Sequence, residues 1–147
     1  MTHSEIQNVM EAYGDLFSRL TIDDLTELGA LVSDDIVFSD PFNLTYGREK
    51  FVNIFAHMFK VMEQPQFKIL DMCYSNRAGY LKWQLTGKVK KWQQIPIDIT
   101  GMSEITINGN GKIIAHYDHW DSASQLLRFI PVLGAPIRWL LKLFRMK

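Results

Sequence analysis

Apolar residues recur every three or four positions along residues 4–20, and this spacing predicts an amphipathic helix. The apolar stripe consists of Ile6, Val9, Met10, Tyr13, Leu16, Phe17 and Leu20. Residues 21–31 predict a second, short helix, because Thr21 and Asp24 suit a capping box and leucines follow along one side. The chain therefore begins with two helices.

Residues 35–41 form a short β-type run that Pro41 ends, since proline cannot donate to a sheet ladder. Helical spacing then returns over residues 47–63 and predicts a third helix. Its core-facing residues are Phe51, Ile54, Phe55, Met58 and Met62.

From residue 66 onward, β-branched and aromatic residues alternate with turn residues, which predicts a run of antiparallel strands. The expected strands are residues 66–75, 79–89, 95–107 and 112–120, and "NGNG" before the last of them is typical of a hairpin turn. Helices followed by a twisted antiparallel sheet indicate an α+β fold.

The last residues predict two short helical pieces, broken at Pro131 and around residues 134–136. We expect residues 1–123 to form the main domain. Residues 124–147 are expected to be an amphipathic helical extension of the same domain.

Composition narrows the classes of function. The 147 residues are 47% hydrophobic, with nine Phe, four Trp and five Tyr, which suits one globular domain with aromatics available to line a cavity. Sixteen basic and sixteen acidic residues cancel, so no nucleic-acid partner is expected. A single cysteine, Cys73, and an opening segment with acidic residues in place of a secretion signal favour a cytoplasmic protein.

The segment "HYDHWD", residues 116–121, carries the densest set of polar and aromatic side chains. In an extended strand, His116, Asp118 and Trp120 share one face, and the other three residues share the opposite face. The alternation alone does not decide which face is buried.

Three stretches resemble one known group of proteins. The residues "MEAYGDLF", "LVSDDIVFSDPFNLTYGREKFVNIFAHMF" and "NGNGKIIAHYDHWD" are similar to the ketosteroid isomerase and SnoaL-like polyketide cyclase branch of the nuclear transport factor 2-like superfamily. The resemblance implies a curved, antiparallel-rich sheet that forms a cone, or cystatin-like roll. N-terminal helices close this cone, and its concave face makes an apolar pocket.

The resemblance also implies roles for individual residues. Asp40 matches the general base of the isomerases, and Tyr13 matches the helix-borne donor to the oxyanion. His116 and Asp118 match last-strand positions that look into the pocket, and Ser103 stands where the isomerases carry a second, acidic donor. Serine is a weaker donor with a shorter reach, which favours the cyclase interpretation. The expected ligand-binding residues are Trp120, Ser103, Phe38, Phe55 and Trp83.

These residue types suit proton abstraction next to a carbonyl group. A carboxylate in an apolar cavity is a competent base because burial disfavours its charged form, and the enolate needs a hydrogen-bond donor. Each assignment has a structural alternative. Asp40 before proline can cap a turn, Tyr13 can be plain core, and His116 with Asp118 can be a satisfied polar pair.

Neither a metal nor a cofactor is expected. A metal site would need His116 and Asp118 to be joined by a distant ligand such as His57, and no ligand spacing supports this. "GMSEI" lacks the second glycine of a nucleophile elbow, and "GNGKI" lacks the spacing of a phosphate-binding loop.

The end of the chain is amphipathic. Residues 136–147 place Ile137, Leu140, Leu141 and Phe144 on one helical face and supply positive charge from Arg138, Lys142, Arg145 and Lys147. Such a helix can lie on an anionic membrane or pack across the cone mouth or a dimer partner. It is too short and too charged to span a bilayer.

Three functions remain open from the sequence. The first is an isomerase or cyclase that acts on a small apolar carbonyl compound. The second is non-catalytic binding of such a molecule, and the third is a protein-interaction module that uses the sheet surface. A homodimer formed through the sheet is expected. Buried carboxylates favour the first two functions, because burying them costs free energy unless they are paired.

Overall fold

The helices of the first half follow the periodicity of the sequence. The computed structural model describes residues 2–75, 78–91 and 95–145. Helix α1 (His3–Arg19) begins with a capping box, in which the Thr2 hydroxyl accepts from the Glu5 backbone N–H and the Glu5 carboxylate accepts from the Thr2 N–H. The 3₁₀ turn η1 (Ile22–Asp24) leads into α2 (Leu25–Leu31).

Helix α3 (Arg48–Val61) begins after Gly47, whose φ of 99° favours glycine. It follows a hairpin of two strands, β1 (Val32–Ser39) and β2 (Leu44–Tyr46). The remaining strands are β3 (Met62–Tyr74), β4 (Gly79–Val89), β5 (Pro96–Ile107) and β6 (Ile113–His119).

Among the described residues these strands form one mixed sheet in the order β2-β1-β6-β5-β4-β3. All neighbouring pairs are antiparallel except β1 and β6, which run parallel, with Phe38 opposite His116. The parallel pair brings the end of β1 beside the end of β6. Residues from the first and last thirds of the chain therefore meet at one place in the sheet.

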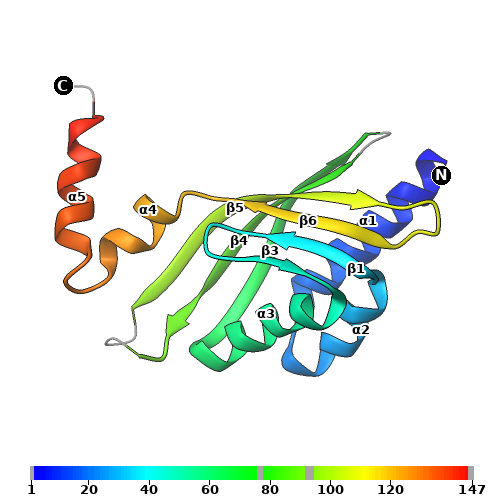
Figure 1. The fold of residues 1–147 in the computed structure, drawn as a ribbon, viewed down its shortest axis with the longest axis horizontal. Helices are drawn as coiled ribbons and strands as arrows, with labels where there is room; N and C mark the ends of the chain where they lie inside the picture. The colour runs from blue at the N-terminus through cyan, green and yellow to red at the C-terminus, as the bar shows by residue number, and fades with distance from the viewer. Residues whose placement is uncertain (1, 76–77, 92–94, 146–147) are drawn as a thin grey trace.

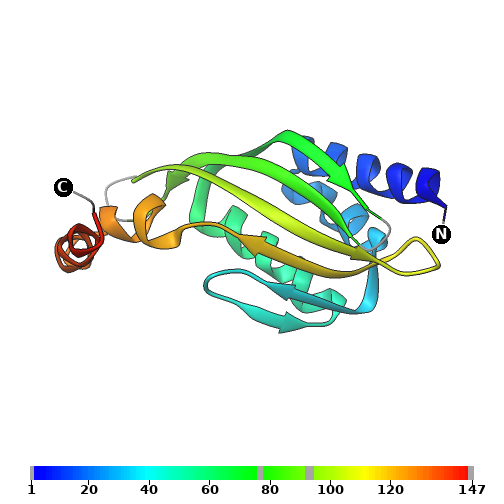
Figure 2. The same ribbon diagram turned by 90° about the horizontal axis from the view of Figure 1, so that it is seen from above.

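The sheet curves around the helices and is not closed into a barrel (Figures 1 and 2). Helix α1 packs on β3 and β4, and α3 contacts both β1 and β3, which lie far apart in the strand order. Strand β3 starts directly after α3, so this helix links the β1 side of the curved sheet to its β3 edge. The core between them contains the fully buried side chains Met10, Tyr13, Leu16, Phe38 and Phe51.

The predicted α+β class, the three N-terminal helices and the four later strands are confirmed. Two details were missed. Strand β1 begins at Val32, three residues before the expected run, and β2 was not predicted at all. Strand β2 has three residues and lies at the sheet edge with Leu44 and Tyr46 exposed, so it is too short and too exposed to produce a hydrophobic pattern.

The C-terminal extension forms α4 (Ser122–Gln125), the 3₁₀ turn η2 (Leu127–Phe129) and α5 (Gly134–Leu143). Residues 146 and 147, part of the expected tail helix, lie outside the described residues. The domain covers this helix only in part, because Ile137 and Leu141 are partly buried, whereas Leu140 and Phe144 are 50% and 82% exposed. Covering of the exposed side chains by a second subunit or a membrane stays a prediction. No helix in the described part of the chain is long and apolar enough to cross a membrane.

Candidate functional site

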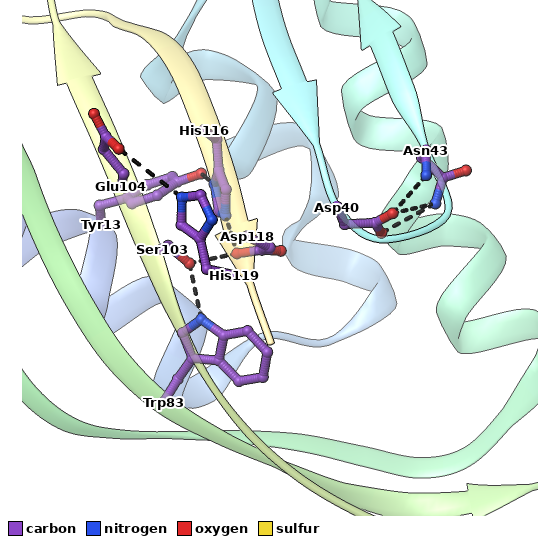
Figure 3. Close-up of polar contacts among 9 residues, drawn as sticks. All are labelled: Tyr13, Asp40, Asn43, Trp83, Ser103, Glu104, His116, Asp118 and His119. Carbon is purple, nitrogen blue, oxygen red and sulfur yellow. Dashed lines mark hydrogen bonds and ion pairs between the residues drawn. The ribbon is translucent and has the colours of Figure 1, made fainter. Parts of the chain in front are cut away.

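A row of hydrogen bonds connects helix α1 to the last strand of the sheet (Figure 3). The Tyr13 hydroxyl lies 2.7 Å from Nδ1 of His116. On the other side of the imidazole ring, Nε2 of His116 lies 2.8 Å from Oδ1 of Asp118. Tyr13 is fully buried, and the side chains of His116 and Asp118 are 3% and 15% exposed. The face of β6 that carries residues 116 and 118 is therefore the inner face.

The row continues across the two preceding strands. Ser103 on β5 stands directly opposite Asp118 on β6, and its hydroxyl donates to Asp118 Oδ1 at 2.5 Å. The Trp83 indole N–H on β4 donates to the same hydroxyl at 2.8 Å. Five side chains from one helix and three strands thus form a single connected set, Tyr13, His116, Asp118, Ser103 and Trp83. We call this set the polar row.

A glycine makes room for the Trp83 ring. Gly101 on β5 is the cross-strand partner of Trp83. A β-carbon at position 101 would lie 2.5 Å from two ring atoms of Trp83 and 3.0 Å from the β-carbon of Trp120. The missing side chain lets the indole lie against β5, where its N–H reaches Ser103.

The hydrogen atoms of the polar row can be assigned from its geometry. An ionised Asp118 accepts hydrogen bonds from the Ser103 hydroxyl and from the Nε2–H of His116, so Nδ1 of the neutral ring accepts a hydrogen bond from the Tyr13 hydroxyl. Burial raises the pKa of Tyr13 well above its usual value, and the negative charge of Asp118 adds to this shift. Tyr13 therefore keeps its proton and acts as the donor.

This raised pKa predicts a change of stability at alkaline pH. At neutral pH, Tyr13→Phe should lower the free energy of unfolding by about 1–3 kcal/mol, because it leaves Nδ1 of His116 unpaired in the core. The contribution of Tyr13 to the free energy of unfolding is fully present below the usual pKa of 10.0. It is lost as the pH rises through the raised pKa of Tyr13 in the folded protein. Between these two pKa values, the free energy of unfolding falls by about 1.4 kcal/mol per pH unit.

Urea unfolding of both proteins from pH 7 to pH 11.5 measures the difference directly. We expect the advantage of the native protein over Tyr13→Phe to shrink above pH 10. A difference that stays constant over the whole range would contradict the assignment of Tyr13 as a buried, protonated donor.

A small apolar cavity lies against the polar row. Its wall is made by Phe17, Phe55, Phe67, Ile69, Leu81, Trp83, Ser103, His116 and Asp118. The cavity is small, because the centre of a water molecule can occupy only about 10 Å³ among these side chains. The space is therefore sufficient for about one water molecule. A larger ligand enters only if wall side chains move.

Asp118 presents one oxygen that the polar row does not use. Both of its side-chain hydrogen bonds end on Oδ1, and Oδ2 has no hydrogen-bond partner among the described residues. The carboxylate is at the same time part of the cavity wall. Asp118 is thus a carboxylate of the cavity wall that is held through one oxygen and keeps a second acceptor unpaired among the described residues.

Asp40 lies at the end of β1 and caps a turn. Its Oδ1 accepts from the backbone N–H groups of Phe42 and Asn43 at 2.8 and 2.6 Å, and the Asn43 amide donates to both oxygens at 3.0 Å. In Figure 3 its carboxylate points toward Asn43, apart from the polar row. These contacts match the turn-capping alternative, and Asp40 is not part of the cavity wall.

Comparison with known proteins places the fold in a family. The family model described as the SnoaL-like domain matches residues 13–116, which is more than two thirds of the chain. The chain belongs to the SnoaL-like family. No curated protein matches the sequence of this SnoaL-like protein closely enough to count as a relative.

Solved structures with the same fold cover most of this SnoaL-like protein. One is a protein with a ketosteroid isomerase-like fold from Catenulispora acidiphila, in complex with trimethylamine. It is 18% identical with a TM-score of 0.68, and the match covers 80% of this chain and 88% of that chain. A steroid delta-isomerase from Pseudomonas aeruginosa is 19% identical, with coverages of 97% and 95% and a TM-score of 0.62. An epoxide hydrolase of LEH-like type from M. tuberculosis is 15% identical, with 95% of both chains covered and a TM-score of 0.66. At these identities the similarity shows the fold alone.

The structure brings together five of the nine residues that the sequence proposed for the site. The cavity wall of this SnoaL-like protein includes Asp118, His116, Ser103, Phe55 and Trp83. Tyr13 lies behind His116, and Phe38 packs in the core against the rings of Phe51, Phe55 and His116. Trp120 is partly buried, with its ring 5.5 Å from that of Phe42. The roles of these residues toward a ligand stay predictions.

Four wall residues were not proposed from the sequence, namely Phe17, Phe67, Ile69 and Leu81. Strand alternation is a signal that could have identified three of them. Phe67 and Ile69 share one face of β3, and Leu81 shares a face of β4 with Trp83. Phe17 is on the apolar stripe of α1, one turn after Tyr13, but nothing in the stripe marks which of its members reach a cavity.

Proposed function

We propose that this SnoaL-like protein removes a proton next to the carbonyl group of a small apolar molecule, with Asp118 as the base. The observation that carries the proposal is the polar row, which ends on Oδ1 of Asp118, a carboxylate of the cavity wall, while Oδ2 has no hydrogen-bond partner among the described residues. A fixed carboxylate with apolar surroundings suits proton abstraction from carbon.

In the proposed step, Asp118 Oδ2 takes the proton and the electron pair of the C–H bond forms an enolate. Return of the proton to a different carbon gives an isomer. Attack of the enolate carbon on a second carbonyl of the same molecule forms a ring, as in a cyclase; the C=O electron pair moves to oxygen, and the alkoxide takes the proton back from Asp118. His116 and Ser103 hold the carboxylate in place from the Oδ1 side.

Tyr13 is assigned a positioning role in this proposal. The sequence suggested that it donates to the enolate oxygen, but its hydroxyl bonds to His116 and does not reach the cavity wall. By holding Nδ1, it fixes the tautomer and orientation of the ring that bonds Asp118. Asp40, the base suggested by the family resemblance, is kept as the alternative base. The parallel register of β1 and β6 supports this alternative, because Ser39 and Tyr117, the residues just before Asp40 and Asp118, stand opposite each other.

The alternative function is binding of a small hydrophobic molecule without turnover. Its support is the composition of the cavity wall, which is mainly Phe17, Phe55, Phe67, Ile69 and Leu81. A protein-interaction role and a homodimer through the outer face of the sheet also remain predictions from the sequence. Size-exclusion chromatography with light scattering measures the oligomeric state directly.

Exchange of α-protons with solvent deuterium tests the proposed chemistry before the substrate is known. A panel of steroid enones, polyketide-like diketones and epoxides is incubated with the protein in D2O and followed by proton NMR. We expect the protein to accelerate loss of an α-proton signal for at least one ketone. Binding without exchange or product would favour the non-catalytic alternative, and opening of an epoxide without exchange would contradict the proposal.

A further inference from the structure

Helix α5 stands at one end of the molecule, away from the helices that cover the sheet (Figures 1 and 2). Its main contacts are with α4 and η2. On the side toward η2, Ile137 and Leu141 are partly buried. The body of the domain leaves the rest of the helix surface open.

The open surface is strongly apolar. Seven of the fourteen exposed large hydrophobic side chains in the described structure lie between residues 129 and 145, so exposure is concentrated there. They are Phe129, Val132, Leu133, Trp139, Leu140, Leu143 and Phe144. On α5, residues 139, 140, 143 and 144 have the spacing of one helical face. A contiguous exposed apolar face of this kind marks an interaction site.

The polar residues of the same extension are cationic. Residues 122–147 contain five lysine or arginine residues and no aspartate or glutamate, so residues 1–121 hold the remaining eleven basic residues against all sixteen acidic ones. The net charge of the whole chain is zero, but the extension is basic and the rest of the domain is acidic. Charge complementarity points to an anionic partner.

Four of these cations line one groove between η2 and α5, namely Arg128, Arg138, Lys142 and Arg145. The Arg138 guanidinium donates to the backbone carbonyl of Arg128 at 2.6 Å, which holds the two arginines together. The Nε–H of Arg128 is buried without an acceptor in the described structure. The groove thus presents several hydrogen-bond donors and no side-chain carboxylate.

We propose that the extension of residues 122–145 binds an anionic phospholipid surface. The apolar face of α5 enters the acyl boundary, with Trp139 at its edge, and the basic side chains lie at the level of the phosphates. A second copy of the chain fits this surface less well. Two copies that met through this same surface would bring together the five basic residues of each extension with no aspartate or glutamate from either one. The inference does not depend on the proposed function.

Vesicle cosedimentation of the full chain tests this inference. We compare vesicles of phosphatidylcholine alone with vesicles that also contain phosphatidylglycerol. The native protein should sediment with the anionic vesicles only and should be released by high salt. The triple variant Arg138→Gln, Lys142→Gln and Arg145→Gln should lose about a hundredfold in vesicle affinity, since each surface cation contributes roughly fivefold.

Two further variants complete the experiment. Lys50→Gln, Lys60→Gln and Lys68→Gln together make the same change in charge at exposed positions of the body, and this control should bind as the native protein does. Leu140→Ser with Leu143→Ser should abolish binding while leaving the melting temperature unchanged, because both side chains are exposed. Equal loss in the lysine control would overturn the inference. Self-association that depends on Leu140 and Leu143, without vesicle binding, would overturn it in favour of a second copy.

Discussion

Replacing Asp118 by asparagine should lower the rate of α-proton exchange by a factor of about 10²–10⁴, the usual contribution of a general base. The amide oxygen of asparagine can accept the bonds that Ser103 and His116 donate to Oδ1, so the polar row stays in place. The amide NH2 then occupies the place of Oδ2 and cannot accept a proton. Initial exchange rates and ligand affinity, measured on the ketone that the panel identifies, separate loss of turnover from loss of binding.

Two other aspartates serve as comparisons. Asp40→Asn tests the base that the family resemblance suggests, and asparagine also suits its turn. Asp35→Asn changes an exposed carboxylate on β1 and should leave the rate unchanged. If Asp40→Asn loses exchange and Asp118→Asn retains it, the base is Asp40 and our assignment is wrong.

Replacing Phe38 by alanine should lower the free energy of unfolding by about 3–5 kcal/mol. The ring is 1% exposed and packs among the rings of Phe51, Phe55 and His116, so its removal leaves a void that the surrounding side chains fill only in part. Urea unfolding at neutral pH gives the value.

Phe42→Ala is the matched control, because it removes the same ring from a position that is 54% exposed. We expect it to cost less than about 1 kcal/mol, as surface substitutions usually do. The sequence placed Phe38 among the ligand-binding residues. If Phe38→Leu keeps the stability but weakens ligand binding strongly, that role holds and our description of Phe38 as a core residue is incomplete.

The unusual features of the site are visible in the sequence only in part. The segment "HYDHWD" marks β6 as chemically unusual, and strand alternation correctly groups residues 116 and 118. The sequence does not show which carboxylate lies beside the cavity. Asp40 directly follows strand β1, and Asp118 lies in strand β6, so the sequence does not distinguish them. Only the structure shows that the Asp40 carboxylate already accepts hydrogen bonds from the Asn43 amide and the turn backbone.

The C-terminal extension is also only partly predictable from the sequence. Its helical spacing and its cations can be read directly from residues 136–147. Whether the apolar face is covered depends on where the extension lies relative to the body. Helix α5 lies beside η2, with Trp139 and Phe144 exposed, and no periodicity within the helix specifies that placement.

The sequence by itself determined all the helices and strands except the short edge strand β2, together with the α+β order and the family. Helix and strand periodicity and turn residues are local properties that neighbouring positions encode, and a three-residue exposed strand carries no such pattern. Only the tertiary structure decided which polar groups meet. The Tyr13–His116 bond spans 103 positions, and the Trp83–Ser103–Asp118 contacts depend on strand register and on Gly101 leaving room for an indole ring. Such contacts arise from the curvature of the sheet and the packing of α1 against it, so the partner of a buried polar group is a property of the whole fold.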